Sequence, residues 1–328
     1  MKKLHVAITG ATGAVGREIL KLLEMRNFPI KNLSLYASKA SFGKKINFKN
    51  TQIKIETLDS LYEKNLDILF NCTSSSLAKK IIPGVNNCKK IIDLSSAYRL
   101  KAPLIVPEIN AHLLTGSQKL FCSPNCVASL LVMALYPLSK IRPLKRVVVS
   151  SYQAASGGGQ KLLDDLLNQT KNYYETKNEP LPYAFNLYLH PSSLNQDLYS
   201  DEEQKVIEET RKILEIENLP MSVTCVRVPT LRAHSLSVNI EFTDSISTNK
   251  ILKALNNFPG IVVKQTEPFT SPKEVSLKSS VFVSRIRKDL SSPSAIDLWI
   301  CGDQLLKGAS LNAVQIAEHL QKQLLFSK

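Results

Sequence analysis

A glycine-rich turn directly follows the first apolar run of this chain, and it strongly restricts the folds that the chain can adopt. Residues 4–9, LHVAIT, predict a short buried β-strand, and residues 10–16, GATGAVG, come next. Apolar residues at helical spacing then continue to about residue 25. A strand, a glycine turn and a helix in this order are typical of a dinucleotide-binding domain, where the pyrophosphate lies at the helix N-terminus. The cofactor contacts of this turn are therefore predicted at Gly10, Thr12, Gly13, Ala14, Val15 and Gly16.

Further apolar segments continue this pattern through the first part of the chain. Residues 33–36, 67–71 and 90–94 predict buried strands, and helical segments are expected between them, as in parallel βαβ units. From residue 146 the strands become longer and richer in β-branched residues, which favours a mixed sheet. This second region contains the runs RVVVSSY, MSVTCVRV, SLSVNIEF and SSVFVSRI, with helices expected at about 159–168 and 201–214.

The closing segment, residues 304–325, has a helical apolar period, but no element next to it in the sequence offers its apolar face a packing partner. We expect it to pack back across the domain boundary. The predicted fold class is α/β, with a Rossmann-like dinucleotide-binding domain at 1–126 that is completed by a C-terminal helix within 304–328. An α+β catalytic domain with a mixed sheet is expected at 127–303. A chain of 328 residues is long enough to form two such cores.

The chain is basic, with 42 Lys and Arg against 28 Asp and Glu and a formal net charge of +14. The lysines are dispersed and form no basic block, so a solvated surface is favoured over a nucleic-acid interface. The longest purely apolar stretch, residues 130–135, is far too short to span a bilayer. Six cysteines without a CxxC pair argue against a zinc site and a disulfide framework. We predict a protein of the reducing cytoplasm, with no metal and no nucleic-acid or membrane partner.

The residues that follow the second predicted strand indicate the choice of cofactor. NAD sites usually place an acidic residue there, where it binds the ribose hydroxyls. This chain has Ala37, Ser38 and Lys39 instead. Because a hydroxyl and a cation suit the 2′-phosphate of NADP, we predict NADP as the cofactor, with contacts from Ser38 and Lys39.

The segment SPNCVAS places Cys126 at the start of a helix expected at 127–136, after a Pro-Asn turn. Helix N-termini stabilise anions, so a thiolate is favoured at this position. Cys126 is therefore the candidate nucleophile, and it requires a group that handles protons nearby.

Five histidines are available for that role. His234 follows a loop that leaves a buried strand, where a general acid/base is commonly held, and it is the preferred candidate. His112 and His190 are expected in loops and stay possible. We expect His5, inside the first strand, and His319, on the last helix, to be structural or exposed.

Motifs distributed over almost the whole chain occur together in one known family. The chain resembles bacterial aspartate-semialdehyde dehydrogenase from residue 10 to residue 320. The matching segments are GATGAVG, DLSSAYRL, VPEIN, SPNCVAS, SYQAASGGG, EEQK, RVPTLRAHS and GDQLLKGASLNAVQIAEHL. The resemblance implies an NADP-dependent enzyme in the biosynthesis of lysine through diaminopimelate, of threonine and of methionine. It also implies a homodimer formed largely through the second domain.

The resemblance also implies roles for individual residues at matching positions. Cys126 would be the nucleophile, His234 the acid/base, and Gln153 would orient the substrate beside the cysteine. Arg227 would pair with the substrate α-carboxylate and Glu202 would hold the α-ammonium group. The phosphate pocket would contain Arg99, Asn125 and Lys205, and the cofactor would also meet Ser156, Gly157 and Gln304. Without the resemblance, Glu202 and Lys205 would be interpreted as an ordinary ion pair on a helix.

The implied reaction is the reversible reductive dephosphorylation of 4-phospho-L-aspartate to L-aspartate 4-semialdehyde. The Cys126 thiolate attacks the acyl carbon and phosphate leaves, so that a thioester forms. Hydride from NADPH then gives the oxyanion of a thiohemiacetal, which can take up a proton from His234; return of that proton lets the oxyanion collapse to the aldehyde with loss of the Cys126 thiolate. Two positions depart from the family pattern: Lys39 stands where an arginine is frequent, and Gln304 replaces an asparagine expected near the nicotinamide.

Other functions explain less of the sequence. An N-acetyl-glutamyl-phosphate reductase shares the glycine turn and the cysteine, but VPEIN, EEQK and RVPTLRAHS disfavour it, and its acetylated substrate would give Glu202 no role. A phosphorylating sugar-aldehyde dehydrogenase has a different cysteine segment. A non-enzymatic NADP-binding or nucleic-acid-binding protein would leave four residues unexplained: Cys126, Gln153, Arg227 and His234.

Overall fold

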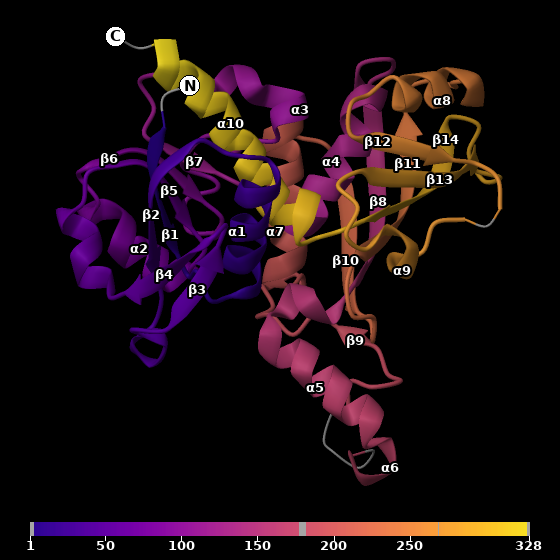
Figure 1. Ribbon diagram of the computed structural model, residues 1–328. Coiled ribbons are helices and arrows are strands. Elements are labelled where there is room, and N and C mark those ends of the chain that lie inside the picture. The colour runs from indigo at the N-terminus through magenta and orange to yellow at the C-terminus, as the bar shows by residue number, and fades with distance from the viewer. Residues whose placement is uncertain (1–2, 177–181, 268, 327–328) are drawn as a thin grey trace. The chain divides into compact units, whose positions relative to one another are not determined.

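The computed structural model describes residues 3–176, 182–267 and 269–326 (Figure 1). The chain divides into two compact units. Unit 1 comprises Met1–Pro124 and Ala309–Lys328, and unit 2 comprises Asn125–Gly308. Cys126 and Gln304 therefore both lie in unit 2, although the sequence pattern placed them in the first domain. The predicted α/β class is confirmed, since each unit contains a sheet covered by helices.

Unit 1 is built on a seven-stranded sheet in the order β3-β4-β2-β1-β5-β6-β7. The strands pair in parallel except at the edge, where β3 and β4 form an antiparallel hairpin. Their bounds are β1 Leu4–Thr9, β2 Ile30–Tyr36, β3 Lys45–Phe48, β4 Thr51–Glu56, β5 Leu66–Asn71, β6 Cys88–Asp93 and β7 Leu120–Cys122.

The hairpin of β3 and β4 corrects the expectation of helical segments between all the early strands. Apolar and polar residues alternate in KINF and TQIKIE, and this period of two suits a half-exposed edge pair. The turn between the two strands begins at Lys49, which takes a positive φ of 51°. In this part of the chain, the alternation of apolar and polar residues therefore gives a hairpin where the βαβ pattern predicted a helix.

The helices of unit 1 come from both ends of the chain. They are α1 Ala14–Met25, α2 Ser75–Ile81, α3 Pro107–Asn110 and α10 Leu311–Phe326. Helix α10 packs against α1, and Arg26 at the end of α1 pairs through two hydrogen bonds of 2.6 and 2.8 Å with Glu318. Ser310 also donates to the carbonyl of Val15, at 3.2 Å. The predicted return of the C-terminal helix to the first domain is confirmed.

Unit 2 contains a second seven-stranded sheet, in the order β12-β13-β14-β11-β8-β10-β9. Two of its pairs, β8 with β10 and β12 with β13, are parallel and the others are antiparallel, which confirms the predicted mixed sheet. The strands are β8 Leu144–Gln153, β9 Tyr188–Leu189, β10 Met221–Arg227, β11 His234–Phe242, β12 Ile261–Lys264, β13 Val281–Lys288 and β14 Ala295–Gly302.

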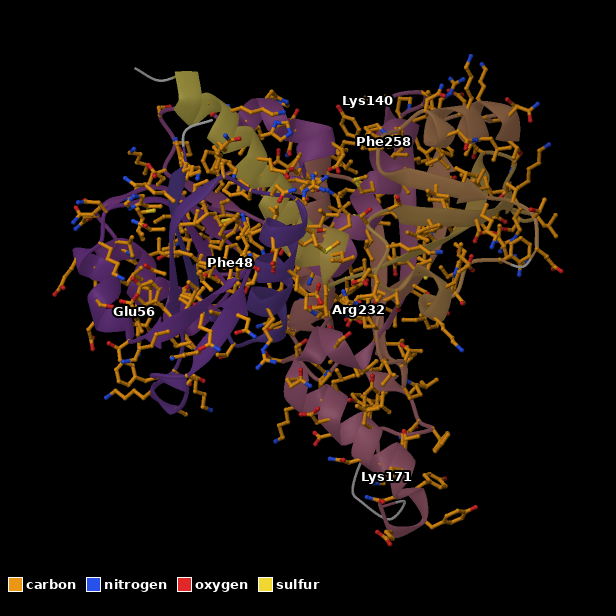
Figure 2. The ribbon with its side chains drawn as sticks, viewed as in Figure 1. Phe48, Glu56, Lys140, Lys171, Arg232 and Phe258 are labelled. Carbon is orange, nitrogen blue, oxygen red and sulfur yellow. The ribbon has the colours of Figure 1, made fainter. Side chains whose placement is uncertain are left out.

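Helix α4, Cys126–Ser139, is the central helix of unit 2 and is buried along almost its whole length. It packs on the sheet and against α7 and α8. At its C-terminal end the ring of Tyr136 lies 5.7 Å from that of Phe258, and the Lys140 ammonium lies 4.7 Å from the Tyr136 ring centre (Figure 2). The other helices of unit 2 are α5 Gln160–Lys171, α6 Tyr173–Thr176, α7 Asp201–Leu214, α8 Thr248–Asn256 and α9 Pro272–Val275.

Helix α7 starts at a capping box that also fixes it to the sheet. The Ser200 hydroxyl accepts from the Glu203 backbone at 3.3 Å, and the Glu203 carboxylate accepts from the Ser200 backbone at 2.8 Å. The second oxygen of Glu203 accepts from the backbone of Cys225 on β10, at 2.8 Å. The first turn of α7, which carries Glu202, is therefore held beside β10.

Among the described residues, none of the helices combines the length and the hydropathy that a transmembrane span requires.

Candidate active site

Cys126 is the first residue of α4, and Asn125 caps that helix. The Asn125 side-chain oxygen accepts from the backbone of Val127 at 2.8 Å and of Ala128 at 3.3 Å. The cysteine is partly exposed and lies against Gly308, where an added Cβ would approach the Cys126 Cβ to 3.0 Å. The thiol therefore stands at the positive end of a capped helix, where a thiolate is stabilised.

A carboxylate from α7 joins this cap to β8. One oxygen of Glu202 accepts from the Asn125 amide at 2.8 Å and from the Gln153 amide at 3.2 Å. Burial acts to raise the pKa of Glu202, but the hydrogen bonds from Asn125 and Gln153 and the charge of Lys205 lower it, and the net shift is downward. Glu202 is therefore an anion at neutral pH, held among donors beside the cysteine.

His234 begins β11 and is completely buried. Its Nδ1 accepts from the backbone N–H of Ala154 at 3.0 Å, so the neutral ring carries its proton on Nε2. Burial, followed by the nearby Arg227 charge, lowers the pKa of His234 to about 3. Nε2 has no hydrogen-bond partner among the described residues. This arrangement presents a neutral imidazole with an N–H that can be donated to a ligand.

Arg227 ends β10 and is also buried, next to His234. Its Nη1 donates to the Ala154 carbonyl at 3.0 Å, and its Nη2 lies 2.8 Å from Nε2 of His190. Gly157 leaves room for both side chains, because an added Cβ would lie 2.9 Å from the His234 ring and 3.2 Å from Arg227 Nη1. The Arg227 Nε has no partner in the described part of the chain.

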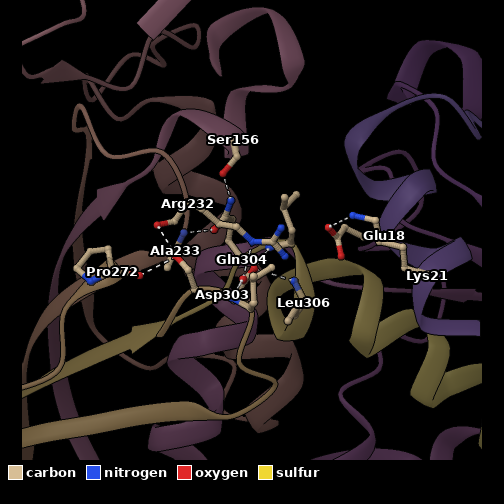
Figure 3. A network of polar contacts seen from close by, with 12 residues as sticks. Glu18, Lys21, Ser156, Arg232, Ala233, Pro272, Asp303, Gln304 and Leu306 are labelled. Carbon is tan, nitrogen blue, oxygen red and sulfur yellow. Dashed lines mark hydrogen bonds and ion pairs between the residues drawn. The ribbon is translucent and has the colours of Figure 1, made fainter. Parts of the chain in front are cut away.

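Gln304 is buried, and both the oxygen and the nitrogen of its amide form hydrogen bonds within unit 2 (Figure 3). Its oxygen accepts from the backbone of Ala233 at 2.8 Å, and its nitrogen donates to the Ser156 hydroxyl at 2.5 Å. Ala233 takes a φ of 72°, a left-handed conformation that costs about 1 kcal/mol for a residue with a Cβ. Gln304 thus holds a strained backbone directly before His234.

The residue before Gln304 fixes the same loop from the other side. The Asp303 carboxylate is inaccessible to solvent and accepts from Arg232 at 2.6 Å and from the backbone of Leu277 at 2.7 Å (Figure 3). Its other oxygen accepts from the backbones of Leu305 and Leu306. The loop that carries Arg232 and Ala233 is therefore bound to the chain after β14.

The glycine turn belongs to unit 1 and depends on close backbone contacts. Gly10 has a φ of 73°, and a Cβ there would approach the carbonyl oxygen of Cys72 to 2.4 Å. A Cβ on Gly16 would approach the Gly10 oxygen to 2.4 Å. Gly13, the exposed N-cap of α1, makes no side-chain cap, so the first N–H groups of α1 have no side-chain acceptor there. Thr12, Ala14 and Val15 complete this turn as partly exposed residues.

The remaining predicted residues are spread over both units. Ser38 and Lys39 are exposed after β2, at the start of a short 3-10 helix. Arg99, in unit 1, donates to the carbonyls of Ser123 at 3.0 Å and Leu94 at 2.9 Å. Lys205 lies one turn after Glu202 on α7 and is half-buried. Unit 2 therefore brings together Cys126, Gln153, Ser156, Gly157, Glu202, Arg227, His234 and Gln304 with Asn125 and Lys205.

Comparison with known proteins identifies the two units. Residues 5–117 match the family described as "Semialdehyde dehydrogenase, NAD binding domain", and residues 135–307 match "Semialdehyde dehydrogenase, dimerisation domain". Aspartate-semialdehyde dehydrogenase from Rickettsia bellii is 44% identical over 98% of both chains, and that from Synechocystis sp. is 40% identical over 97% of both. The chain belongs to the aspartate-semialdehyde dehydrogenase family.

A solved member of this family has the same fold. Aspartate semialdehyde dehydrogenase II from Vibrio cholerae, complexed with ASA, superposes with a TM-score of 0.93 at 31% identity, over 98% of this chain and 99% of that one. The chain is therefore an oxidoreductase of amino-acid biosynthesis with a nicotinamide-dinucleotide-binding domain. The resemblance drawn from the sequence motifs is confirmed.

Several residues of this dehydrogenase's site were missed or left unassigned by the sequence pattern. Glu209 accepts from the backbone of Asn125 at 2.5 Å, and Gly308 packs on the cysteine. Ala233 carries the strained φ, and His190 contacts Arg227. None of them has a local signature, because each acts through a neighbour distant in sequence. Of the other histidines, His112 and His319 are exposed and His5 contacts Asn32.

Proposed function

We propose that this family member performs its reaction at Cys126, with NADPH as reductant. In the biosynthetic direction the thiolate attacks the acyl carbon of 4-phospho-L-aspartate, and phosphate leaves with the electrons of the C–O bond. A thioester on Cys126 results. Bound nicotinamide supplies the hydride that reduces this thioester. The observation that supports the proposal best is the position of Cys126 at a capped helix N-terminus, beside the Asn125–Glu202–Gln153 hydrogen bonds.

His234 acts on the oxygen of the intermediates through its Nε2–H. The ring is neutral and Ala154 occupies Nδ1, so Nε2 is a donor to the oxyanion of the thiohemiacetal. Collapse of that oxyanion expels the Cys126 thiolate and gives the aldehyde, which requires no net proton. In reverse, the same N–H polarises the aldehyde for attack by the thiolate.

Substrate recognition is assigned to charged groups around this centre. The guanidinium of Arg227, whose Nε has no partner among the described residues, suits the α-carboxylate, and the Glu202 anion suits the α-ammonium group. Gln153, whose Oε1 has no partner among the described residues, orients the substrate beside Cys126. Arg99, Asn125 and Lys205 are assigned to the phosphate, by chemistry of the side chains and by the family resemblance.

The residues of unit 1 fit a dinucleotide. The glycine turn is closed towards Cys72 but open at Gly13, so a pyrophosphate can approach the N-terminus of α1. Ser38 and Lys39 are exposed, and the sequence after β2 has no acid, which favours the 2′-phosphate of NADP over the free hydroxyl of NAD. Ser156 and Gly157 are assigned to the nicotinamide side. Gln304 is assigned there through Ser156, which it orients.

The functional assembly is proposed to be a homodimer formed through unit 2. Large apolar side chains are exposed in one stretch around α5, α6 and the edge strand β9, which favours a protein interface. They are Leu167, Tyr174, Phe185, Leu187, Leu189, Leu194 and Leu198. Sedimentation analysis is expected to give a dimer, and a fully active monomer would contradict this part of the proposal.

The decisive assay measures phosphate-dependent reduction of NADP by the purified protein with L-aspartate 4-semialdehyde. NAD and N-acetyl-glutamate 5-semialdehyde serve as parallel alternatives. Turnover that requires phosphate and the free-amine aldehyde, and prefers NADP, is expected. Turnover only with the acetylated aldehyde would move the substrate assignment to the N-acetyl-glutamyl-phosphate reductase reaction. A folded protein that binds NADPH but turns over no aldehyde would favour a non-enzymatic role.

A further inference from the structure

His190 is fixed beside Arg227 by its own backbone. It follows β9, at the edge of the sheet, and its N–H donates to the carbonyl of Cys225 on β10 at 2.9 Å. Two residues further along β10, the Nη2 of Arg227 lies 2.8 Å from Nε2 of His190. The contact therefore joins two backbone-anchored segments, and its geometry is determined by the pairing of β9 with β10.

The chemistry of the two groups defines which atom carries the proton. An arginine side chain has only donors, so Nε2 of His190 must accept through its lone pair. A neutral ring then has its proton on Nδ1, which faces the Ser192 hydroxyl at 3.2 Å. The Ser192 oxygen also accepts from the backbone of Glu202 at 3.2 Å. A chain of hydrogen bonds thus runs from the start of α7 through Ser192 and His190 to Arg227.

Protonation of His190 would break this chain, because an imidazolium has two donors and no acceptor. The charged groups around it are Glu202, Glu203 and Lys205 on α7 and Arg227 on β10, with the neutral His234 beyond Arg227. Burial is the main cause that lowers the pKa of His190 below its ordinary value. The charges of Arg227 and Lys205 also lower this pKa, whereas the charge of Glu202 raises it. The accepting, neutral form is therefore present at neutral pH and is lost only as the pH falls below 6.5.

We propose that His190 is a positioning residue that holds the Arg227 guanidinium in the orientation needed for the α-carboxylate of the substrate. The Arg227 Nε, which has no hydrogen-bond partner among the described residues, would then be available to the carboxylate. This inference rests on the proposed role of Arg227. It adds a determinant of amino-acid recognition from a stretch of the chain, residues 186–200, to which the family motifs assign nothing.

The test compares His190→Leu with His190→Gln. Leucine removes the acceptor, whereas the glutamine amide oxygen can take the place of Nε2. We expect His190→Leu to raise the KM for L-aspartate 4-semialdehyde by on the order of tenfold, as expected for a hydrogen bond to a charged group. The KM values for NADP and phosphate should change less than about twofold. His190→Gln should restore the aldehyde KM to near that of the wild type.

A pH series separates this role from a purely structural one. In the wild type the aldehyde KM should rise as the pH is lowered below 6.5, because protonated His190 no longer accepts from Arg227. In His190→Gln this rise should be absent under the same phosphate conditions. Thermal denaturation of each variant shows whether it is folded.

The possible results are distinguishable. An unchanged aldehyde KM in folded His190→Leu, or equal increases in all three KM values, would overturn the inference. A wild-type protein with no semialdehyde turnover would instead overturn the proposed function. A pH dependence that persists in His190→Gln would show that another group titrates.

Discussion

The glycine turn of unit 1 and the cysteine site of unit 2 are two ligand-binding regions that the chain builds in different ways. The turn lies within residues 10–16, and its shape depends on steric contacts such as the approach of Gly10 to the Cys72 carbonyl. The cysteine site takes residues from α4, β8, α7, β10, β11 and the loop after β14. Its members are positioned by hydrogen bonds between segments far apart in sequence, for example Asn125 to Glu202.

This difference determines how each region responds to substitution. A turn made from one segment keeps its shape as long as its own glycines and the adjacent strands are intact. A site assembled from six elements depends on residues that position others, such as Gln304, which binds the Ala233 backbone, and Gly157, which leaves room for His234 and Arg227. Substitutions can therefore separate the two regions, and the expected effects differ in size.

Cys126→Ala should give the largest effect. Without the thiolate no thioester forms, so turnover is expected to fall by at least about 10⁴-fold. NADPH binding, measured by fluorescence titration, should stay close to that of the wild type because the cofactor contacts are assigned mainly to unit 1. Cys88→Ala is the matched control, since this buried thiol lies in unit 1. Loss of NADPH binding in Cys126→Ala would contradict the assigned role.

Gly157→Ala should lower kcat/KM by about 100-fold, because the new methyl group would displace His234 and Arg227 from reacting positions. Gly116→Ala, where a Cβ meets nothing within 4 Å, is the control. Circular dichroism shows whether both variants keep their secondary structure. Activity near the wild-type value in folded Gly157→Ala would mean that the site tolerates movement of these two side chains.

Gln304→Asn should reduce kcat by roughly tenfold and the free energy of unfolding by about 1–3 kcal/mol. The shorter amide cannot reach both Ala233 and Ser156, so a buried N–H loses its partner. Adding Ala233→Gly should recover part of the loss, since glycine adopts the positive φ without strain. Chemical denaturation and steady-state kinetics measure the two effects. No recovery in the double variant would show that strain at Ala233 is not the cause.

Lys39→Ala should give the smallest effect, an increase of about 2- to 5-fold in the KM for NADP, as expected for an exposed charge pair. The KM for NAD should not rise. The difference in the KM for NADP between Lys39→Ala and the wild type should become smaller at high salt. Lys31→Ala, which removes another exposed lysine of unit 1, is the control. An equal change in the KM for NAD and for NADP would show that Lys39 does not bind the 2′-phosphate.

The fold was largely predictable because its strongest signals are local. Residues 4–9 and 201–214 were predicted as a strand and a helix, and the structure has β1 and α7 at these bounds. The hairpin of β3 and β4 was missed, although its alternating residues are visible, because the βαβ pattern suggested helices there. Cys126 could be identified from its turn and its helix.

The two domain types, the family and the identity of the chemical groups depend on contiguous patterns and ordered motifs, so they can be recognised in the chain itself. How these groups are used depends on tertiary contacts. The tertiary structure gives His234 a proton on Nε2, uses the amide of Gln304 for Ala233 and Ser156, and places His190 on Arg227. The physical reason is that a side chain's protonation and orientation depend on partners that folding brings from distant positions, and no local pattern records those partners.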